Sequence, residues 1–81
     1  MKVSVALFAQ ARDLIGDGKV EIDLPAGADV QMLRQRLQQQ CPAAAELIAR
    51  ASIAIDDRFA SAGDVLDESQ EVSLIPPVSG G

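Results

Sequence analysis

The 81-residue sequence predicts an α+β fold, in which one main helix covers one face of a mixed β-sheet. Three observations lead to this fold class. Apolar and polar residues alternate near both ends of the chain, as in half-buried strands. Between these ends, residues 30–40 repeat apolar side chains at helical spacing. Hydrophobic residues make up 48% of the chain, which argues against disorder.

Two strands are expected at the start of the chain. Residues 2–9 and 19–24 both alternate apolar and polar side chains, so each stretch has one apolar face. In the first stretch the core-facing residues are Val3, Val5, Leu7 and Ala9. Ala11–Ile15 is expected to form a short helical turn between the strands, closed by Gly16. We expect the two strands to pair as an antiparallel hairpin with a long loop.

The main helix is expected at Val30–Gln40. Asp29 stands at its N-cap position, where a carboxylate accepts a hydrogen bond from the first turn, and Pro42 prevents its continuation. The apolar side chains at helical spacing are Val30, Leu33 and Leu37. A second, short helix is expected at Ala43–Arg50.

The remaining strands predict a β-grasp (ubiquitin-like) sheet. We expect them at Ser52–Asp56 and Glu71–Ile75, with Phe59 in a short extended segment between them. A right-handed crossover lets the first and last strands pair in parallel in the middle of the sheet. A ferredoxin-like fold would need a second full crossover helix, for which Ala43–Arg50 is too short and too early. We therefore divide the chain into a β-grasp domain at 1–75 and an extended, flexible tail at 76–81.

Composition argues against several classes of function. The net charge of −5 and the scattered basic residues argue against nucleic acid, which needs a basic patch. With no histidine and one cysteine, the chain has no disulfide, no Cys–His pair or histidine triad, and no spacing typical of a metal site. No segment resembles a signal peptide or a membrane span, so a cytoplasmic protein is expected. The acidic surface suits a basic protein partner, although solubility alone would also account for it.

The C-terminal segment PPVSGG is the most informative part of the chain. The Pro76-Pro77 pair lacks backbone N–H groups, so it ends the last strand and favours an extended backbone. Val78 can fill a small apolar pocket, Ser79 can form hydrogen bonds, and Gly80-Gly81 fits where only a backbone can pass. Such an end could carry its carboxylate into another enzyme, where adenylation by ATP and attack by sulfur would give a thiocarboxylate. The alternative is a flexible end that happens to contain glycines.

Three stretches of the sequence resemble one known family. LFAQARDLIG at Leu7–Gly16 is similar to the family's first strand and loop, and IPPVSGG at Ile75–Gly81 matches its tail. The positions that match its helix are Val30, Leu33 and Leu37. The family is the MoaD family of ubiquitin-like sulfur carriers, which contains the small subunit of molybdopterin synthase. The resemblance covers nearly the whole chain, and the tail is its most specific part.

The resemblance implies a function for the tail. Gly81 would be adenylated by an E1-like activating enzyme that uses ATP and then converted to a thiocarboxylate, with Gly80 keeping the channel accessible. The tail would enter the large subunit of molybdopterin synthase and donate sulfur to cyclic pyranopterin monophosphate, in molybdenum cofactor biosynthesis. The assembly would be a heterotetramer with two small subunits on a large-subunit dimer. The chain itself would be a non-catalytic sulfur donor that binds no cofactor.

Phe8 is the strongest candidate for partner binding outside the tail. Alternation turns Phe8 away from the core, Ile75 falls on the same outer face of the neighbouring last strand, and Phe59 could reach it. We expect these side chains to form an exposed apolar patch where both partners dock. The family docks its partners through this face, and Pro76–Ser79 would extend the contact. The alternative is a small cluster covered by loops.

Four other features of the sequence bear on the site. Cys41 has no neighbouring base or cation in the sequence and is interpreted as structural. Asp56-Asp57 is interpreted as a turn, because adjacent strand residues point to opposite faces and would not form a carboxylate pair. Arg12 matches an arginine of the family's first loop and could contact a partner or cap carbonyl groups. SQEV at Ser69–Val72 replaces the usual GDEV, and Asp56 replaces a frequent Asn, so local turn geometry is in question.

Other functions fit the same tail. Sulfur carriers for thiazole synthesis or tRNA thiolation share Gly-Gly but usually lack the preceding Pro-Pro. A ubiquitin-like modifier joined to lysines through Gly81, or an interaction domain with an inert tail, would also fit.

Overall fold

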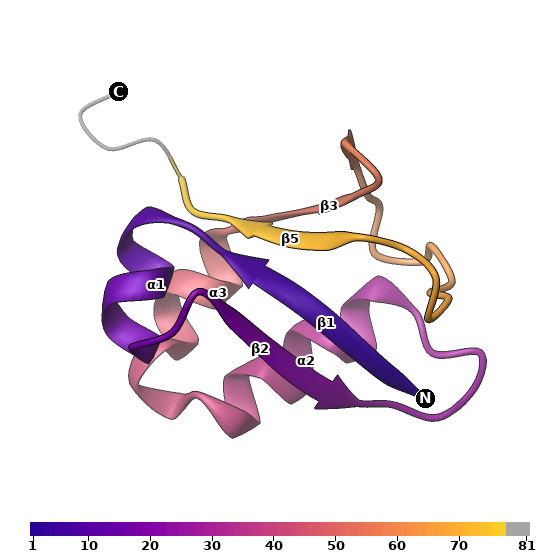
Figure 1. Ribbon diagram of the computed structural model, residues 1–81, viewed down its shortest axis with the longest axis horizontal. Helices are drawn as coiled ribbons and strands as arrows, with labels where there is room; N and C mark the ends of the chain where they lie inside the picture. The colour runs from indigo at the N-terminus through magenta and orange to yellow at the C-terminus, as the bar shows by residue number, and fades with distance from the viewer. Residues whose placement is uncertain (78–81) are drawn as a thin grey trace.

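A five-stranded mixed sheet forms one layer of the molecule, and the helices pack against one of its faces (Figure 1). The computed structural model describes residues 1–77. Its strands are β1 (Lys2–Leu7), β2 (Lys19–Asp23), β3 (Ser52–Ile55), β4 (Arg58–Phe59) and β5 (Val72–Ile75). Its helices are α1 (Ala9–Ile15), α2 (Val30–Gln40), the 3₁₀ turn η1 (Pro42–Ala44) and α3 (Ala45–Arg50).

The strand order β2-β1-β5-β3-β4 confirms the predicted β-grasp fold. β1 pairs antiparallel with β2 and parallel with β5, and β5 pairs antiparallel with β3. The first and last strands therefore lie in the middle of the sheet, as the sequence predicts. Because β5 is held by a strand on each side, the tail starts from a firmly paired element.

The core lies between the sheet and the helices. Alternate residues of β1 face it, and α2 buries one side against it. The buried residues of these two elements are Val3, Val5, Leu7, Val30, Leu33 and Leu37. At the start of α2, the Asp29 carboxylate accepts a hydrogen bond from the backbone N–H of Met32 at 2.9 Å. This bond confirms the predicted N-cap and fixes where the helix begins.

The first strand is shorter than predicted. β1 ends at Leu7, and α1 begins at Ala9, whose positive φ of 50° interrupts the alternation. Ala9 is therefore exposed instead of facing the core, and Ala11 supplies the buried side chain of α1. The helix predicted at Ala43–Arg50 is also divided, because Pro42 opens a 3₁₀ turn before α3.

Side chains from α2 cover part of the outer edge of β2. Arg36 Nη1 donates a hydrogen bond to the carbonyl oxygen of Asp23 at 2.9 Å. Gln40 Nε2 donates to the carbonyl oxygen of Glu21 at 3.2 Å. β2 stands at the end of the strand order, so these carbonyl groups have no strand to pair with on that side.

Candidate functional site

β5 delivers the chain to its tail from the centre of the sheet. Ile75 and Pro76 are half-buried at the end of this strand, and Pro77 is exposed. Neither proline can donate a backbone hydrogen bond, so strand pairing stops at Ile75. The predicted site residues Val78, Ser79, Gly80 and Gly81 lie outside the described residues.

The face of the sheet opposite the helices, the open face, carries a row of small side chains. Ala6 lies opposite Lys19 on β2 and Ser73 on β5. Ser73 in turn lies opposite Ala54 on β3, which faces Phe59 on β4. Directly opposite residues share a face, so one continuous row crosses all five strands. Its two ends are long side chains, and its three central members are small.

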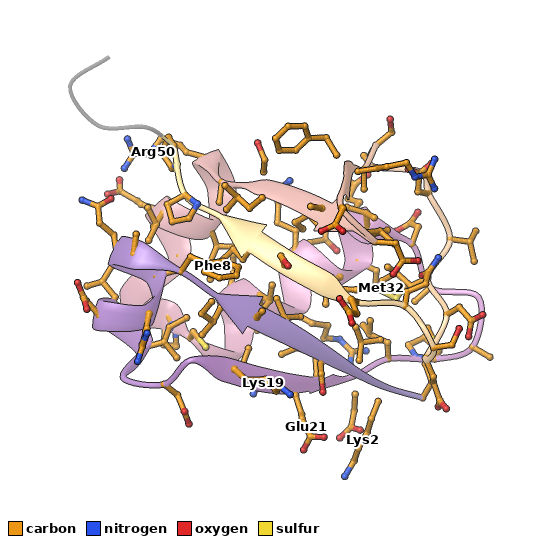
Figure 2. All side chains as sticks on the ribbon, turned by 45° about the horizontal axis from the view of Figure 1, so that its top comes forward. Lys2, Phe8, Lys19, Glu21, Met32 and Arg50 are labelled. Atoms are coloured by element: carbon orange, nitrogen blue, oxygen red, sulfur yellow. The ribbon has the colours of Figure 1, made fainter. Side chains whose placement is uncertain are left out.

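A hollow of about 270 Å³ opens above this row, and we refer to it as the open-face hollow. The residues that line it are Phe8, Ala54, Asp57, Phe59, Ser73 and Ile75. Phe8 is 51% and Phe59 is 75% exposed, and Figure 2 shows the Phe8 side chain near the end of β1. Exposed large apolar side chains gathered at one hollow are typical of a docking surface. The structure thus brings Phe8, Phe59 and Ile75 together on the open face, and the alternative of a covered cluster is wrong.

The backbone at Phe8 explains why its ring faces outward. Phe8 has extended φ and ψ angles of −129° and 154° and caps the N-terminal end of α1. Its carbonyl oxygen accepts a hydrogen bond from the N–H of Ala11 at 3.1 Å. The residue therefore continues the alternation of β1 by one position, and the chain turns into the helix only after it.

The hairpin between β3 and β4 borders the open-face hollow. Asp56 and Asp57 have positive φ angles of 49° and 66°, as the two central residues of a type I′ turn require. The Asp56 carboxylate accepts a hydrogen bond from the backbone N–H of Glu71 at 2.9 Å, while Asp57 lines the hollow. The prediction of a turn is confirmed. The Asp56 side chain holds the hairpin to β5, and Asp57 faces the hollow.

A second hollow of about 410 Å³ adjoins the first and shares Phe8, Asp57 and Ser73 with it. Its remaining lining includes the charged residues Lys19 and Glu71. The open face is therefore apolar toward the tail and charged on its other side. Since Lys19 and Glu71 are both exposed, their charges are available to a partner.

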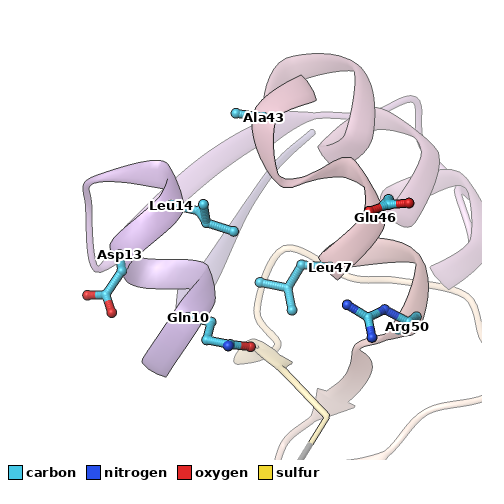
Figure 3. Close-up of a pocket in the computed structure, with 7 residues that line it drawn as sticks. All are labelled: Gln10, Asp13, Leu14, Ala43, Glu46, Leu47 and Arg50. Atoms are coloured by element: carbon cyan, nitrogen blue, oxygen red, sulfur yellow. The ribbon is translucent and has the colours of Figure 1, made fainter. Parts of the chain in front are cut away.

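Sequence reasoning missed a groove between α1 and α3. Figure 3 shows Leu14 and Leu47 pointing into it from the two helices. Ala11 is the buried residue of α1, and Leu14 on the same helix is 52% exposed. An apolar side chain on α1 that does not face the core was therefore the sequence signal for this groove. The full lining of this groove of about 410 Å³ is Gln10, Asp13, Leu14, Ala43, Glu46, Leu47 and Arg50.

Cys41 and Arg12 have ordinary surroundings. Cys41 is half-buried at the end of α2, and burial raises the pKa of its thiol. A raised pKa disfavours the reactive thiolate, which agrees with a structural cysteine. Arg12 is exposed, and its carbonyl oxygen accepts a hydrogen bond from Gly16 at 2.8 Å. The side chain of Arg12 lines a polar hollow beside Asp17 in the loop before β2.

Residues 1–77 contain no group of three or more side chains that could together hold a metal ion. The same residues contain no helix with the length and hydrophobicity to cross a bilayer.

The chain is similar in sequence to one protein family and similar in fold to several solved structures. The model of the ThiS family matches residues 5–81. The molybdopterin synthase sulfur carrier subunit of Caenorhabditis briggsae is 31% identical, with 100% of this chain and 99% of that protein covered. SAMP1 from Haloferax volcanii has the same fold, with a TM-score of 0.86 at 24% identity over 100% of both chains. A protein–protein complex of subunits 1 and 2 of the molybdopterin-converting factor from Helicobacter pylori contains a chain that matches with a TM-score of 0.69, 27% identity and 100% coverage of both chains.

Proposed function

The chain belongs to the ThiS family, and on this basis we propose that it is the sulfur carrier subunit of a molybdopterin synthase. The observation that carries the proposal is the extent of the match. Similarity to molybdopterin synthase sulfur carrier subunits covers the whole chain and so includes the PPVSGG segment. Likeness of fold alone would not select this function, because β-grasp domains serve several purposes.

In the proposed reaction Gly81 is the carrier residue. Its carboxylate attacks the α-phosphate of ATP in an E1-like activating enzyme, and pyrophosphate leaves. The terminal sulfur of a donor persulfide then attacks the acyl carbon of the adenylate, AMP leaves, and an acyl disulfide forms. A thiol then attacks the donor's sulfur and breaks the S–S bond, so that the donor leaves as a disulfide with that thiol and the chain ends in a thiocarboxylate. Gly80 and Gly81 have no side chain to obstruct a narrow catalytic channel, which supports this use of the tail. ATP binds to the activating enzyme, and the chain itself carries no cofactor.

The thiocarboxylate then transfers its sulfur within a large subunit. In our proposal the tail enters that subunit, which holds cyclic pyranopterin monophosphate, and two small and two large subunits form a heterotetramer. The complex of subunits 1 and 2 from Helicobacter pylori supports a partner of this kind. We propose that the reaction takes place in the cytoplasm, where thiols stay reduced.

The open face is the proposed docking surface for both partners. Phe8, Phe59 and Ile75 gather at its hollow, and Ile75 directly precedes the tail. Pro76 and Pro77 would hold the tail away from the sheet, and Val78 and Ser79 would make the first contacts inside the channel. A partner bound to this face is thus positioned to receive Gly81.

The test is the intact mass of the chain after incubation with its activating enzyme, ATP and a sulfur donor. A gain equal to the exchange of one oxygen for one sulfur, located on the C-terminal peptide, supports the proposal. Stable conjugates between Gly81 and lysines would instead identify a protein modifier. An unchanged mass, with the activating enzyme shown to work on another carrier, contradicts sulfur loading.

A further inference from the structure

The open-face hollow has the shape of a socket for a side chain. Its floor is formed by Ser73 and Ala54, which lie opposite each other on β5 and β3. Phe8, Ile75 and Phe59 also line the hollow. Ala54 is only 7% exposed, whereas Phe59, which lies opposite it, is 75% exposed. The hollow therefore lies where a small side chain stands next to a large one in the same row.

We propose that the open-face hollow receives a single apolar side chain of the large subunit, and that a basic side chain of the same segment lies beside it against Asp57 and Glu71. This inference rests on the proposed function. It adds to that function the chemistry by which the partner is recognised. The open face then binds through a socket and a charged rim, not through flat apolar contact.

The apolar part of the inference follows from the lining. Five of the six lining residues have an apolar side chain or a small hydroxyl group, and the sixth, Asp57, is acidic. Two aromatic rings left in water are a favourable anchor when a partner covers them, because interface energy concentrates where large side chains fill pockets. A volume of about 270 Å³ is enough for one inserted side chain.

The basic part follows from the distribution of charge. Asp57 lines both hollows, and Glu71 joins it in the second. Lys19 also lines the second hollow, but it stands on β2 at the far end of the row from the β3–β4 hairpin that carries Asp57. The second hollow thus has two acidic side chains and one basic side chain among its lining residues, and a further basic side chain fits beside Asp57 and Glu71. Such a pair at an exposed rim speeds association more than it deepens affinity.

Ser73→Leu tests the socket, since the larger side chain fills the floor. We expect binding to the purified large subunit, measured by titration calorimetry, to weaken at least about tenfold, with the melting temperature of the free chain retained. Ala49→Leu is the matched control, because it adds a leucine at an exposed position of α3 on the other side of the molecule. It should bind as the unaltered chain does.

The double variant Asp57→Asn and Glu71→Gln tests the rim. Asn tolerates the positive φ at position 57, so the hairpin is retained. We expect the association rate at low salt to fall severalfold and its dependence on salt to flatten. Asp13→Asn with Glu46→Gln removes the same two charges at the helix groove and should leave the rate nearly unchanged.

The outcomes separate this inference from the proposed function. Unchanged affinity in Ser73→Leu overturns the socket, and equal slowing by both double variants overturns the basic contact. If Phe8→Ser still weakens binding in those cases, docking on the open face stands without the inference. If the unaltered chain does not bind the large subunit, the proposed function and the inference both fail.

Discussion

Asp56 and Glu71 are joined by two hydrogen bonds that tie the β3–β4 hairpin to the start of β5. The Asp56 carboxylate accepts from the N–H of Glu71 at 2.9 Å, and the N–H of Asp56 donates to the carbonyl oxygen of Glu71 at 2.9 Å. The hairpin carries Asp57 to the open-face hollow, and β5 carries Ser73 there. This pair of bonds therefore sets the relative position of two parts of the proposed docking surface.

Asp56→Ala should destabilise the domain. The variant loses the acceptor for Glu71 and places an alanine at a φ of 49°, where a Cβ is unfavourable without local hydrogen bonding. We expect a loss of about 1–2 kcal/mol in the free energy of unfolding, seen as a lower midpoint in urea. Asp56→Asn keeps an acceptor oxygen and tolerates this backbone, so it should unfold near the midpoint of the unaltered chain. A midpoint of Asp56→Ala equal to both would show that the side-chain bond to Glu71 contributes no stability.

Deletion of Gly81 should abolish sulfur transfer and leave the fold intact. The deleted residue follows Pro76-Pro77, beyond the last strand, and the core is formed by residues before that point. Circular dichroism melting should match the unaltered chain, while product formation by the reconstituted synthase should disappear. Gly80→Trp should behave similarly, because a bulky side chain would block a narrow channel. A large drop in melting temperature would assign the tail a structural role.

Phe8→Ser should weaken partner binding more than it weakens folding. The ring is 51% exposed in the free chain, so its removal costs the isolated domain little, whereas a ring at the centre of an interface contributes about 2 kcal/mol or more. Calorimetric titration against the large subunit and a melting curve of the free chain separate the two effects. Leu14→Ser is the control, since Leu14 is 52% exposed but lies on the helix groove. Equal losses of affinity in both variants would mean that the open face is not the docking surface.

Cys41→Ser should retain sulfur transfer, because in the proposed reaction the terminal carboxyl group carries the transferred sulfur. In the unaltered chain, burial raises the pKa of the Cys41 thiol, so less thiolate is present at neutral pH than for a free cysteine. Alkylation by iodoacetamide should therefore be slower than for a model thiol at the same pH, and its rate should keep rising into a more alkaline range. A folded but inactive serine variant would give Cys41 a role in the reaction.

The sequence allowed most element positions and the central pairing of the first and last strands to be predicted. The positions follow from short-range patterns, and the pairing follows from the right-handed crossover rule. Val3, Val5 and Leu7 show the period of a strand, and Asp29 before Val30, Leu33 and Leu37 marks a capped helix. Even the exposure of Phe8 follows from alternation alone.

What the sequence could not predict depends on contacts between distant segments. The row Ala6–Ser73–Ala54 exists only once the registers of three strands are known, so neither the socket nor its floor has a local signal. The early start of α1 at Ala9 depends on a positive φ that alanine seldom adopts. Leu14 shows an unused apolar side chain in the sequence, but its groove requires α3 beside it.

The side chains of Arg36 and Gln40 on the edge of β2 have a consequence for behaviour at high concentration. By occupying the carbonyl groups of Asp23 and Glu21, they remove hydrogen-bond acceptors that a foreign strand would need to extend the sheet. β4, at the opposite edge, has only two residues and offers a short template. Growth of chains into fibrils by edge-to-edge addition is therefore hindered at both ends of the sheet, and an Arg36→Ala, Gln40→Ala double variant should aggregate faster on shaking.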